Sequence, residues 1–106
     1  MQRKLILTSD GSHTISLPEL NVTYHSVHGA IQESDHIFIK AGLNSVLQAE
    51  PRNLKIFEMG FGTGLNALLT IIEAERLKRN VYYETVEQFP MNGDETSLLN
   101  YCTQLD

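Results

Sequence analysis

At residues 57–66 the chain reads Phe57-Glu58-Met59-Gly60-Phe61-Gly62-Thr63-Gly64-Leu65-Asn66. The apolar residues that lead into this segment, from residue 54, are typical of a buried strand, and the amphipathic pattern that follows Asn66 is typical of a helix. Glycines at positions 60, 62 and 64 let the backbone come close to a ligand that a Cβ would keep away. The segment therefore predicts a strand, a glycine-rich turn and a helix, with Glu58 placed to face a cationic group.

The rest of the chain divides into short elements on both sides of this segment. We expect strands at residues 5–8 and 14–17, joined as a hairpin by the turn at 9–12, and extended segments at 22–26, 54–59 and 81–89. We expect one or two short helices between residues 29 and 49 with a break at Gly42, an amphipathic helix from Asn66 to Arg79, and a helix at 96–105. Residues 54–89 then form a strand–helix–strand unit with parallel strands, which predicts an α/β fold.

Composition narrows the function classes. A chain of 106 residues is enough for one domain. The formal net charge of −5 argues against broad electrostatic binding of nucleic acid, which needs clustered lysine and arginine. Cys102 is the only cysteine, so no internal disulfide forms, and a free thiol fits a reducing compartment. The first residues lack the apolar run of a secretion signal and no stretch approaches membrane-spanning length, so we expect a cytoplasmic protein with no membrane partner.

Three ligand classes compete for the glycine-rich turn. A dinucleotide fingerprint needs glycine at the sixth position, where this chain has Leu65, and a phosphate-binding P-loop needs a lysine that does not follow Gly64. The acidic-x-Gly-x-Gly-x-Gly pattern that begins at Glu58 fits proteins that bind S-adenosylmethionine, a cofactor with a sulfonium, an amino group and a ribose. The structural alternative is that the glycines only let a helix pack closely on a strand.

A second acidic residue supports a cofactor site. In such strand–helix–strand units, an Asp or Glu near the end of the second strand, about 20 residues on, bonds the ribose hydroxyls. Glu84 and Glu87 are the candidates, and Glu87 lies closer to the carboxyl end of the strand, where ligands bind. We therefore choose Glu87 and expect Glu84 to face elsewhere. The alternative is that Glu87 is only a solvated charge at the end of a strand.

Three histidines, His25, His28 and His36, raise the question of a metal. A metal site needs convergent ligands at fixed spacing, and without a nearby cysteine the His25-x-x-His28 pair is weak evidence. We predict no metal, and we expect these residues to serve in hydrogen bonding and packing. Ser34 is a candidate N-cap of a helix.

Motifs on both sides of the glycine-rich turn occur in a fixed order. They are Tyr24-His25-Ser26, His28-Gly29-Ala30, Glu33-Ser34-x-His36-x-Phe38-Ile39, Ala41-Gly42-Leu43, Phe57-Glu58-x-Gly60-Phe61-Gly62-Thr63-Gly64-Leu65-Asn66 and Val86-Glu87-x-x-Pro90. Together they resemble the methyltransferase domain of the MnmC family, including its single-domain MnmD-like members. The resemblance covers nearly all of the chain from residue 24 to about residue 99.

The resemblance implies a Rossmann-like class I methyltransferase fold with S-adenosylmethionine as cofactor and tRNA as partner. The family methylates the 5-aminomethyl group of the wobble 2-thiouridine. By the match, the methionine part of the cofactor is surrounded by Glu58, Gly60, Gly62 and Gly64, and Glu87 holds the ribose. Thr63 and Asn66, counted with the cofactor-binding residues, and the substrate candidates Glu33 and Ser34 then lie near the cofactor or the target base. The resemblance assigns no catalytic base. The family's later Asp-Gly-Phe motif, beside the reacting amine, does not occur in this chain.

We expect residues 1–106 to be the N-terminal part of one methyltransferase domain of a longer protein. Residues 1–50 would form a hairpin and helical lead-in, and residues 54–106 the cofactor-binding unit. The full-length protein is then an enzyme, while the activity of this part alone stays open. One alternative is a methyltransferase for a small molecule or a protein, which the acidic charge favours. Another is a non-catalytic fragment that self-associates through open sheet edges.

Overall fold

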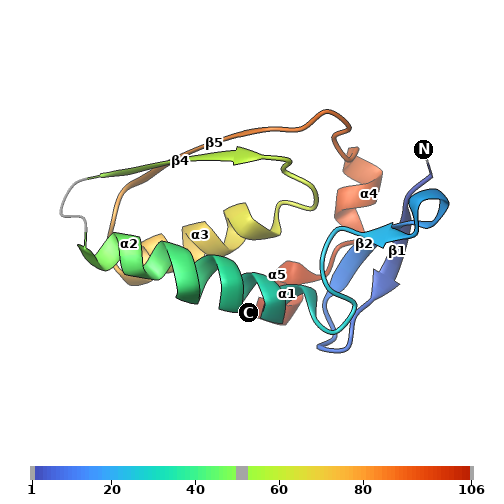
Figure 1. Cartoon of the computed structure of the whole chain (residues 1–106), viewed down its shortest axis with the longest axis horizontal. Coiled ribbons are helices and arrows are strands. Elements are labelled where there is room, and N and C mark those ends of the chain that lie inside the picture. Colours follow the sequence, from blue (N-terminus) through green and yellow to red (C-terminus); the bar gives the residue numbers. More distant parts are fainter. Residues whose placement is uncertain (1, 50–52, 106) are drawn as a thin grey trace.

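The computed structural model describes residues 2–49 and 53–105 and has a mixed α/β architecture with two small sheets (Figure 1). The elements are β1 (Lys4–Leu7), β2 (His13–Leu17), the 3-10 helix η1 (Pro18–Leu20), β3 (Val22–Thr23), α1 (Ala30–Ser34), the π-helix η2 (Asp35–Leu43), α2 (Asn44–Ala49), β4 (Leu54–Met59), α3 (Leu65–Arg76), β5 (Val81–Val86), α4 (Gly93–Ser97) and α5 (Tyr101–Leu105). β1, β2 and β3 form an antiparallel sheet, and β4 and β5 form a parallel one.

The parallel sheet confirms the predicted strand–helix–strand unit. β4 and β5 pair in register from Leu54↔Val81 to Met59↔Val86, and α3 makes the crossover that parallel strands require. One face of this sheet lies over the helices (Figure 1). Leu54, Ile56 and Val81 pack from that face against the buried core. The opposite face is exposed, because alternate residues of both strands point away from the helices.

The core lies between the helices rather than between two sheets. Its buried members come from α1, η2, α2, α3 and α5: Ala30, Ile39, Leu43, Leu47, Leu65, Leu69 and Tyr101. Leu47 and Leu65 are among the largest fully buried side chains. Burying a leucine contributes about 1.5–3 kcal/mol to folding, so the packing of α3 against the helix at 30–49 is a main source of stability.

α1, η2 and α2 form one continuous helical segment, which we call the 30–49 helix (Figure 1). The predicted break at Gly42 is therefore wrong, because Gly42 lies inside η2. The wider turn of this π-helix is seen where the N–H of Asn44 donates to the carbonyl of Ile39. Ile39 and Leu43, on either side of Gly42, are buried in the core. Their packing outweighs the low helix propensity of glycine.

The turn of the β1–β2 hairpin caps the 30–49 helix. The first N–H groups of this helix donate to side chains of residues 8–12. The pairs are Ala30 N to Thr8 Oγ1 (3.2 Å), Ile31 N to Ser12 Oγ (3.1 Å) and Gln32 N to Asp10 Oδ2 (2.9 Å). The carboxylate of Asp10 also lies at the positive end of the helix dipole. Ser34, predicted as a cap, lies instead in the last turn of α1, so that prediction is wrong.

The predicted hairpin strands at 5–8 and 14–17 are confirmed to within a residue as β1 and β2. The extended segment predicted at 22–26 is shorter, since β3 holds only Val22 and Thr23. The strand predicted at 81–89 ends at Val86. After β3 and after β5, the chain turns toward the cavity described below.

The helix predicted at 96–105 is two helices. α4 begins early, because Asn92 and Glu95 form a capping box at its start. The chain leaves the helix before Asn100, whose Oδ1 accepts from His13 N at 2.9 Å and whose Nδ2 donates to Gly11 O at 2.8 Å. These bonds tie the segment between α4 and α5 to the hairpin, and they explain the interruption.

Arg3, just before β1, links the hairpin to the segment that follows β5. Its guanidinium donates to both carboxylate oxygens of Glu95, at 2.8 and 3.2 Å, and to the carbonyls of Phe89 (2.7 Å) and Pro90 (3.2 Å). Such a fork of bonds matches the planar geometry of arginine and not that of lysine. The segment that follows β5 is thereby held against β1.

We predict that Asp10→Ala lowers the free energy of unfolding at pH 7 by about 1–2 kcal/mol, the usual cost of removing a helix cap. Burial acts to raise the pKa of Asp10, but hydrogen bonds from Ser12, Gln32 and Thr8 outweigh it and lower this pKa from 3.8 to about 2. The stabilisation is therefore fully present above pH 3.8 and is lost as the pH falls through about 2.

Urea unfolding curves at pH 7 and at pH 2 measure this difference. The control is Glu75→Ala, which removes an exposed carboxylate from α3 and should change stability by less than about 0.5 kcal/mol. An Asp10→Ala variant as stable as the wild type at pH 7, or equally destabilised at both pH values, would contradict the capping role.

Candidate functional site

A cavity of about 420 Å³ lies where the parallel strands end. Five of the residues predicted to bind a cofactor line it: Glu58, Gly60, Gly62, Asn66 and Glu87. Tyr24 and His25, from the loop after β3, complete the wall together with Leu17, Phe61 and Phe89. The volume falls within the range of small-molecule sites, about 300–1,000 Å³. Glu58 and Glu87 thus face one common space.

Glu58 lies near the end of β4 on the face toward the helices. Its carboxylate accepts from Asn66 Nδ2 at 3.3 Å and from Thr85 Oγ1 at 3.2 Å. Burial first, and the Glu58 carboxylate second, raise the pKa of Tyr83, so this phenol stays protonated at neutral pH.

Asn66, in the first turn of α3, presents an unsatisfied acceptor. Its NH₂ group points to the Glu58 carboxylate, which can only accept, so its Oδ1 lies on the other side of the amide. This oxygen is buried and has no hydrogen-bond partner within residues 2–49 and 53–105. A buried acceptor without a donor costs about 1–3 kcal/mol. Because this oxygen is enclosed by protein atoms, the acceptor that the Glu58–Asn66 pair offers to a cationic group in the cavity is the Glu58 carboxylate.

Glu87 follows β5 and is held by the backbone. Its Oε1 accepts from Gly62 N at 2.7 Å and its Oε2 from Phe89 N at 3.1 Å. The hydrogen bond from Gly62, followed by that from Phe89, lowers the pKa of Glu87 and keeps it ionised at neutral pH. Since a carboxylate has about four acceptor positions, Glu87 retains capacity for two hydroxyl donors of a ligand.

Glu84 faces away from this cavity, as the sequence predicts. It pairs with Phe57 on the exposed face of the parallel sheet, where its carboxylate accepts from the Tyr82 hydroxyl at 3.1 Å. Because successive strand residues alternate between faces, Glu84 cannot share a ligand with Glu58.

The glycine-rich turn leaves space at its first position. Gly60 has φ +86°, and a Cβ there would meet no atom within 4 Å, so this residue opens toward the cavity. At Gly62, φ is +58° and a Cβ would come within 3.3 Å of the Tyr24 ring. Both positions require a conformation that residues with a Cβ rarely adopt. Gly64 does not line the cavity and instead packs against the ring of Phe61.

Thr63 also turns away from the cavity. Its side chain is buried, and its Oγ1 lies 3.0 Å from the Tyr101 hydroxyl and 3.4 Å from His25 Nε2. The sequence predicts that Thr63 contacts a cofactor. In the structure its side chain instead contacts Tyr101 of α5 and His25, and it does not line the cavity.

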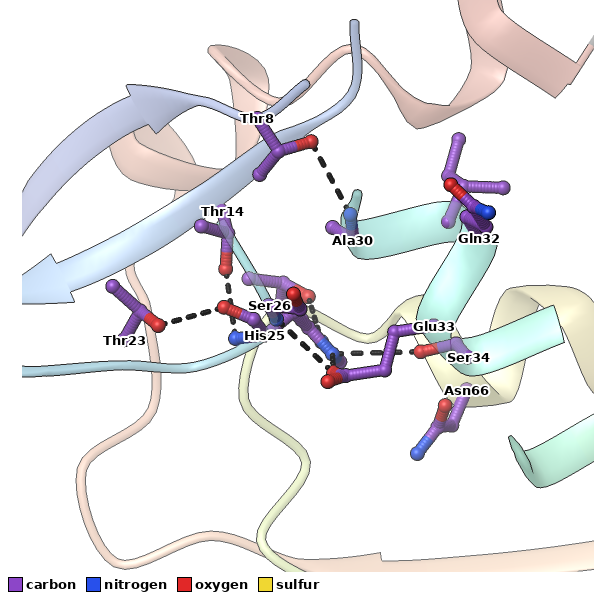
Figure 2. A network of polar contacts seen from close by, with 12 residues as sticks. Thr8, Thr14, Thr23, His25, Ser26, Ala30, Gln32, Glu33, Ser34 and Asn66 are labelled. Atoms are coloured by element: carbon purple, nitrogen blue, oxygen red, sulfur yellow. Dashed lines mark hydrogen bonds and ion pairs between the residues drawn. The ribbon is translucent and has the colours of Figure 1, made fainter. Parts of the chain in front are cut away.

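Glu33 and Ser34, the substrate candidates, contact the cavity only through His25 (Figure 2). Ser34 Oγ lies 3.4 Å from His25 Nδ1, and Glu33 Oε1 lies 3.7 Å from the same nitrogen. Glu33 also accepts from Ser26 N at 3.1 Å. Glu33 and Ser34 therefore lie beside the cavity, with the ring of His25 between them and the cavity.

Sequence reasoning gave Tyr24 and His25 no role in this cavity. Their motif carried part of the family resemblance, but no periodicity marks a loop residue that meets the glycine-rich turn only in three dimensions. In the described residues, no group of three or more His, Cys, Asp or Glu side chains is arranged to hold a metal ion. No helix in that part of the chain is long and apolar enough to cross a membrane.

Comparisons with known proteins find MnmC proteins. The chain is 33% identical over 98 residues to the tRNA 5-methylaminomethyl-2-thiouridine biosynthesis bifunctional protein MnmC of Burkholderia thailandensis, a match that covers 86% of this chain and 14% of that protein. MnmC proteins of Burkholderia mallei and Burkholderia pseudomallei are 38% identical over 66 residues, covering 62% of this chain and 10% of each relative. No family model matches the chain. No solved structure matches it significantly.

These matches agree with the motifs quoted from the sequence. The share of each relative that is covered, 14% and 10%, means that the chain corresponds to a small segment of proteins many times longer. The resemblance is thereby confirmed: the chain is similar to one part of the MnmC proteins, which are bifunctional tRNA-modifying enzymes.

Proposed function

We propose that this chain supplies the cofactor site of an S-adenosylmethionine-dependent methyltransferase that modifies the 5-aminomethyl group of wobble 2-thiouridine in tRNA. The observation that carries the proposal is the joint placement of Glu58, Asn66 and Glu87 around one cavity beside the glycine-rich turn. The MnmC relatives, named for the biosynthesis of tRNA 5-methylaminomethyl-2-thiouridine, support the substrate.

In this proposal residues 1–106 belong to one Rossmann-like class I methyltransferase domain. Residues 54–106 contribute the strand–helix–strand unit, and residues 1–50 the hairpin and helical lead-in that close the cavity. The parallel pairing of β4 with β5 and the site at their carboxyl ends support this assignment, because ligands of open α/β sheets bind there. A tRNA substrate places the protein in the cytoplasm.

Each acidic residue has a separate task in the proposed site. Glu58, held by the amide of Asn66, accepts from the ammonium of the methionine part, and Glu87 accepts from the two ribose hydroxyls. S-adenosylmethionine would supply a methyl group activated by its sulfonium. The residues of this chain hold and orient the cofactor and exclude water from it, which is the main contribution of a protein to an in-line transfer. We assign no catalytic base.

The charge of the chain bears on the substrate. With a net charge of −5, this part adds little attraction for RNA, so we propose that contacts to tRNA come from other surfaces of a longer protein. The same acidity favours the alternative of a methyltransferase for a small molecule or a protein. Methyl transfer by the full-length protein to tRNA with 5-aminomethyl-2-thiouridine, but not to tRNA with unmodified uridine, is the outcome that supports the tRNA proposal.

A second candidate function is self-association, and one surface favours it. The exposed face of the parallel sheet carries large apolar side chains, Phe57, Met59, Tyr82 and Val86, of which Met59 is 78% exposed. Lys55 and Glu84 share this face, so the apolar side chains are concentrated at the end where Met59 pairs with Val86. The outer edges of β4 and β5 are also unpaired among the described strands, which permits pairing with another chain.

We predict that Glu87→Gln and Glu58→Gln each weaken the binding of S-adenosylhomocysteine by roughly ten- to a hundredfold, as expected from the loss of a charge-assisted hydrogen bond. Isothermal titration calorimetry at pH 7.5 measures this change. Glutamine at position 87 can still accept from Gly62 N but not also from Phe89 N, so circular dichroism should first show that the Glu87→Gln variant keeps the wild-type fold.

Glu84→Gln is the matched control, since it removes the same charge from the opposite face of the sheet, and its affinity should stay within about twofold of the wild type. Two results would argue against the proposed site: no heat of binding in the wild-type protein at millimolar ligand, or an equal loss of binding in all three variants.

We also predict that the chain self-associates at high concentration and that Met59→Glu prevents it. Light scattering after size exclusion should give a mass above 12.0 kDa for the wild type and 12.0 kDa for the variant. The control is Ile72→Glu, which places the same charge on an exposed apolar position of α3. A wild-type mass of 12.0 kDa at all concentrations would remove this candidate.

A further inference from the structure

His25 is placed unlike the other residues of the cavity wall. Its side chain is only 14% exposed and is wedged between α1 and the glycine-rich turn (Figure 2). Nδ1 lies 3.4 Å from Ser34 Oγ and 3.7 Å from Glu33 Oε1, and Nε2 lies 3.4 Å from Thr63 Oγ1. The imidazole is thus the bridge between a helix of the lead-in and the turn that precedes α3.

The backbone of His25 is anchored as well. Its N–H donates to Thr14 Oγ1 at 3.0 Å, and its carbonyl accepts from Thr23 Oγ1 at 2.7 Å (Figure 2). Thr14 is fully buried in β2. Because β2 and β3 of the antiparallel sheet fix both backbone groups of His25, we infer that the glycine-rich turn is held to the ring through Thr63.

The contacts of the ring define a direction of hydrogen bonding. Burial is the main influence on His25 and lowers its pKa, while the charges of Glu33 and Glu58 oppose this effect. In a neutral ring one nitrogen donates and the other accepts. Nδ1 faces the Ser34 hydroxyl at 3.4 Å, and the nearest oxygen of Glu33 lies farther away, at 3.7 Å. With its proton on Nε2, the neutral ring accepts from Ser34 at Nδ1 and donates to the Thr63 hydroxyl at Nε2.

The chain of bonds continues beyond Thr63. The Tyr101 hydroxyl lies 3.0 Å from Thr63 Oγ1 and 2.7 Å from the carbonyl of His13. Because a carbonyl oxygen only accepts, the single hydroxyl proton of Tyr101 goes to His13, and Thr63 donates to Tyr101. Protonation of the ring adds a proton at Nδ1, beside Ser34 and Glu33, and leaves the contact with Thr63 in place. The neutral and protonated rings therefore differ in the charge on the wall of the cavity.

We propose that His25 is a positioning residue that holds the glycine-rich turn through Thr63, and that it must be neutral for a cationic cofactor to bind beside Glu58 and Glu87. The inference rests on the proposed function. The groups that face the ring are Glu33 from α1, Glu58 from β4 and Tyr101 from α5. Its protonation would put a positive charge next to the sulfonium and ammonium of S-adenosylmethionine, which like-charge repulsion disfavours.

Calorimetry with S-adenosylmethionine between pH 5.0 and 8.0 tests the proposal. We expect a constant affinity in the wild type near pH 8 and a fall at acidic pH, once the pH passes below the lowered pKa of His25, by up to about tenfold per pH unit. The fall should be smaller with S-adenosylhomocysteine, which lacks the sulfonium charge. His25→Gln keeps an acceptor and a donor but does not titrate, so its affinity should be independent of pH over this range.

An NMR titration of the histidine resonances gives a second measurement that needs no variant. By linkage, S-adenosylmethionine should lower the apparent pKa of His25. Wild-type binding with no pH dependence and no shift of His25 would overturn this inference while sparing the proposed function. No binding at any pH would overturn both.

Discussion

Parallel pairing of β4 with β5 is the constraint on which this structure depends. Two parallel strands cannot be joined by a hairpin, so α3 must cross over one face of the sheet, and the chain must turn sharply between β4 and α3. Gly60 and Gly62 provide that turn through positive φ angles. Glu87 then bonds the N–H of Gly62, which joins the end of the second strand to the turn that follows the first. The cavity is a consequence of this closure.

The hairpin contributes to the site from outside the parallel sheet. Its turn caps the 30–49 helix through Asp10 and its neighbours, and its second strand anchors the backbone of His25. The helix in turn presents Glu33 and Ser34 to the imidazole. The lead-in therefore shapes the wall of the cavity as well as covering the core.

Local patterns predicted what depends on neighbours in sequence. The hairpin, the strand–turn–helix at 54–76, the second strand and the inward position of Glu87 relative to Glu84 all follow from alternation, turn residues and the order of elements. The wrong predictions concern elements whose structure depends on packing and on contacts between residues far apart in the sequence. Gly42 remains helical because Ile39 and Leu43 are buried, and the last helix is interrupted because Asn100 bonds to the hairpin. The inward turn of Thr63 likewise depends on Tyr101, 38 positions away.

The π-helical part of the 30–49 helix has a consequence for related sequences. A π-helix takes up more residues per turn than an α-helix, so η2 holds surplus chain length between two ends that are both fixed. The capped start and α2, which holds Leu47 in the core, can keep their places if one residue is lost from this stretch, since the remaining turns can tighten to α geometry. We therefore expect a change of length to be better tolerated here than in the glycine-rich turn, where Gly60 and Gly62 need positive φ angles.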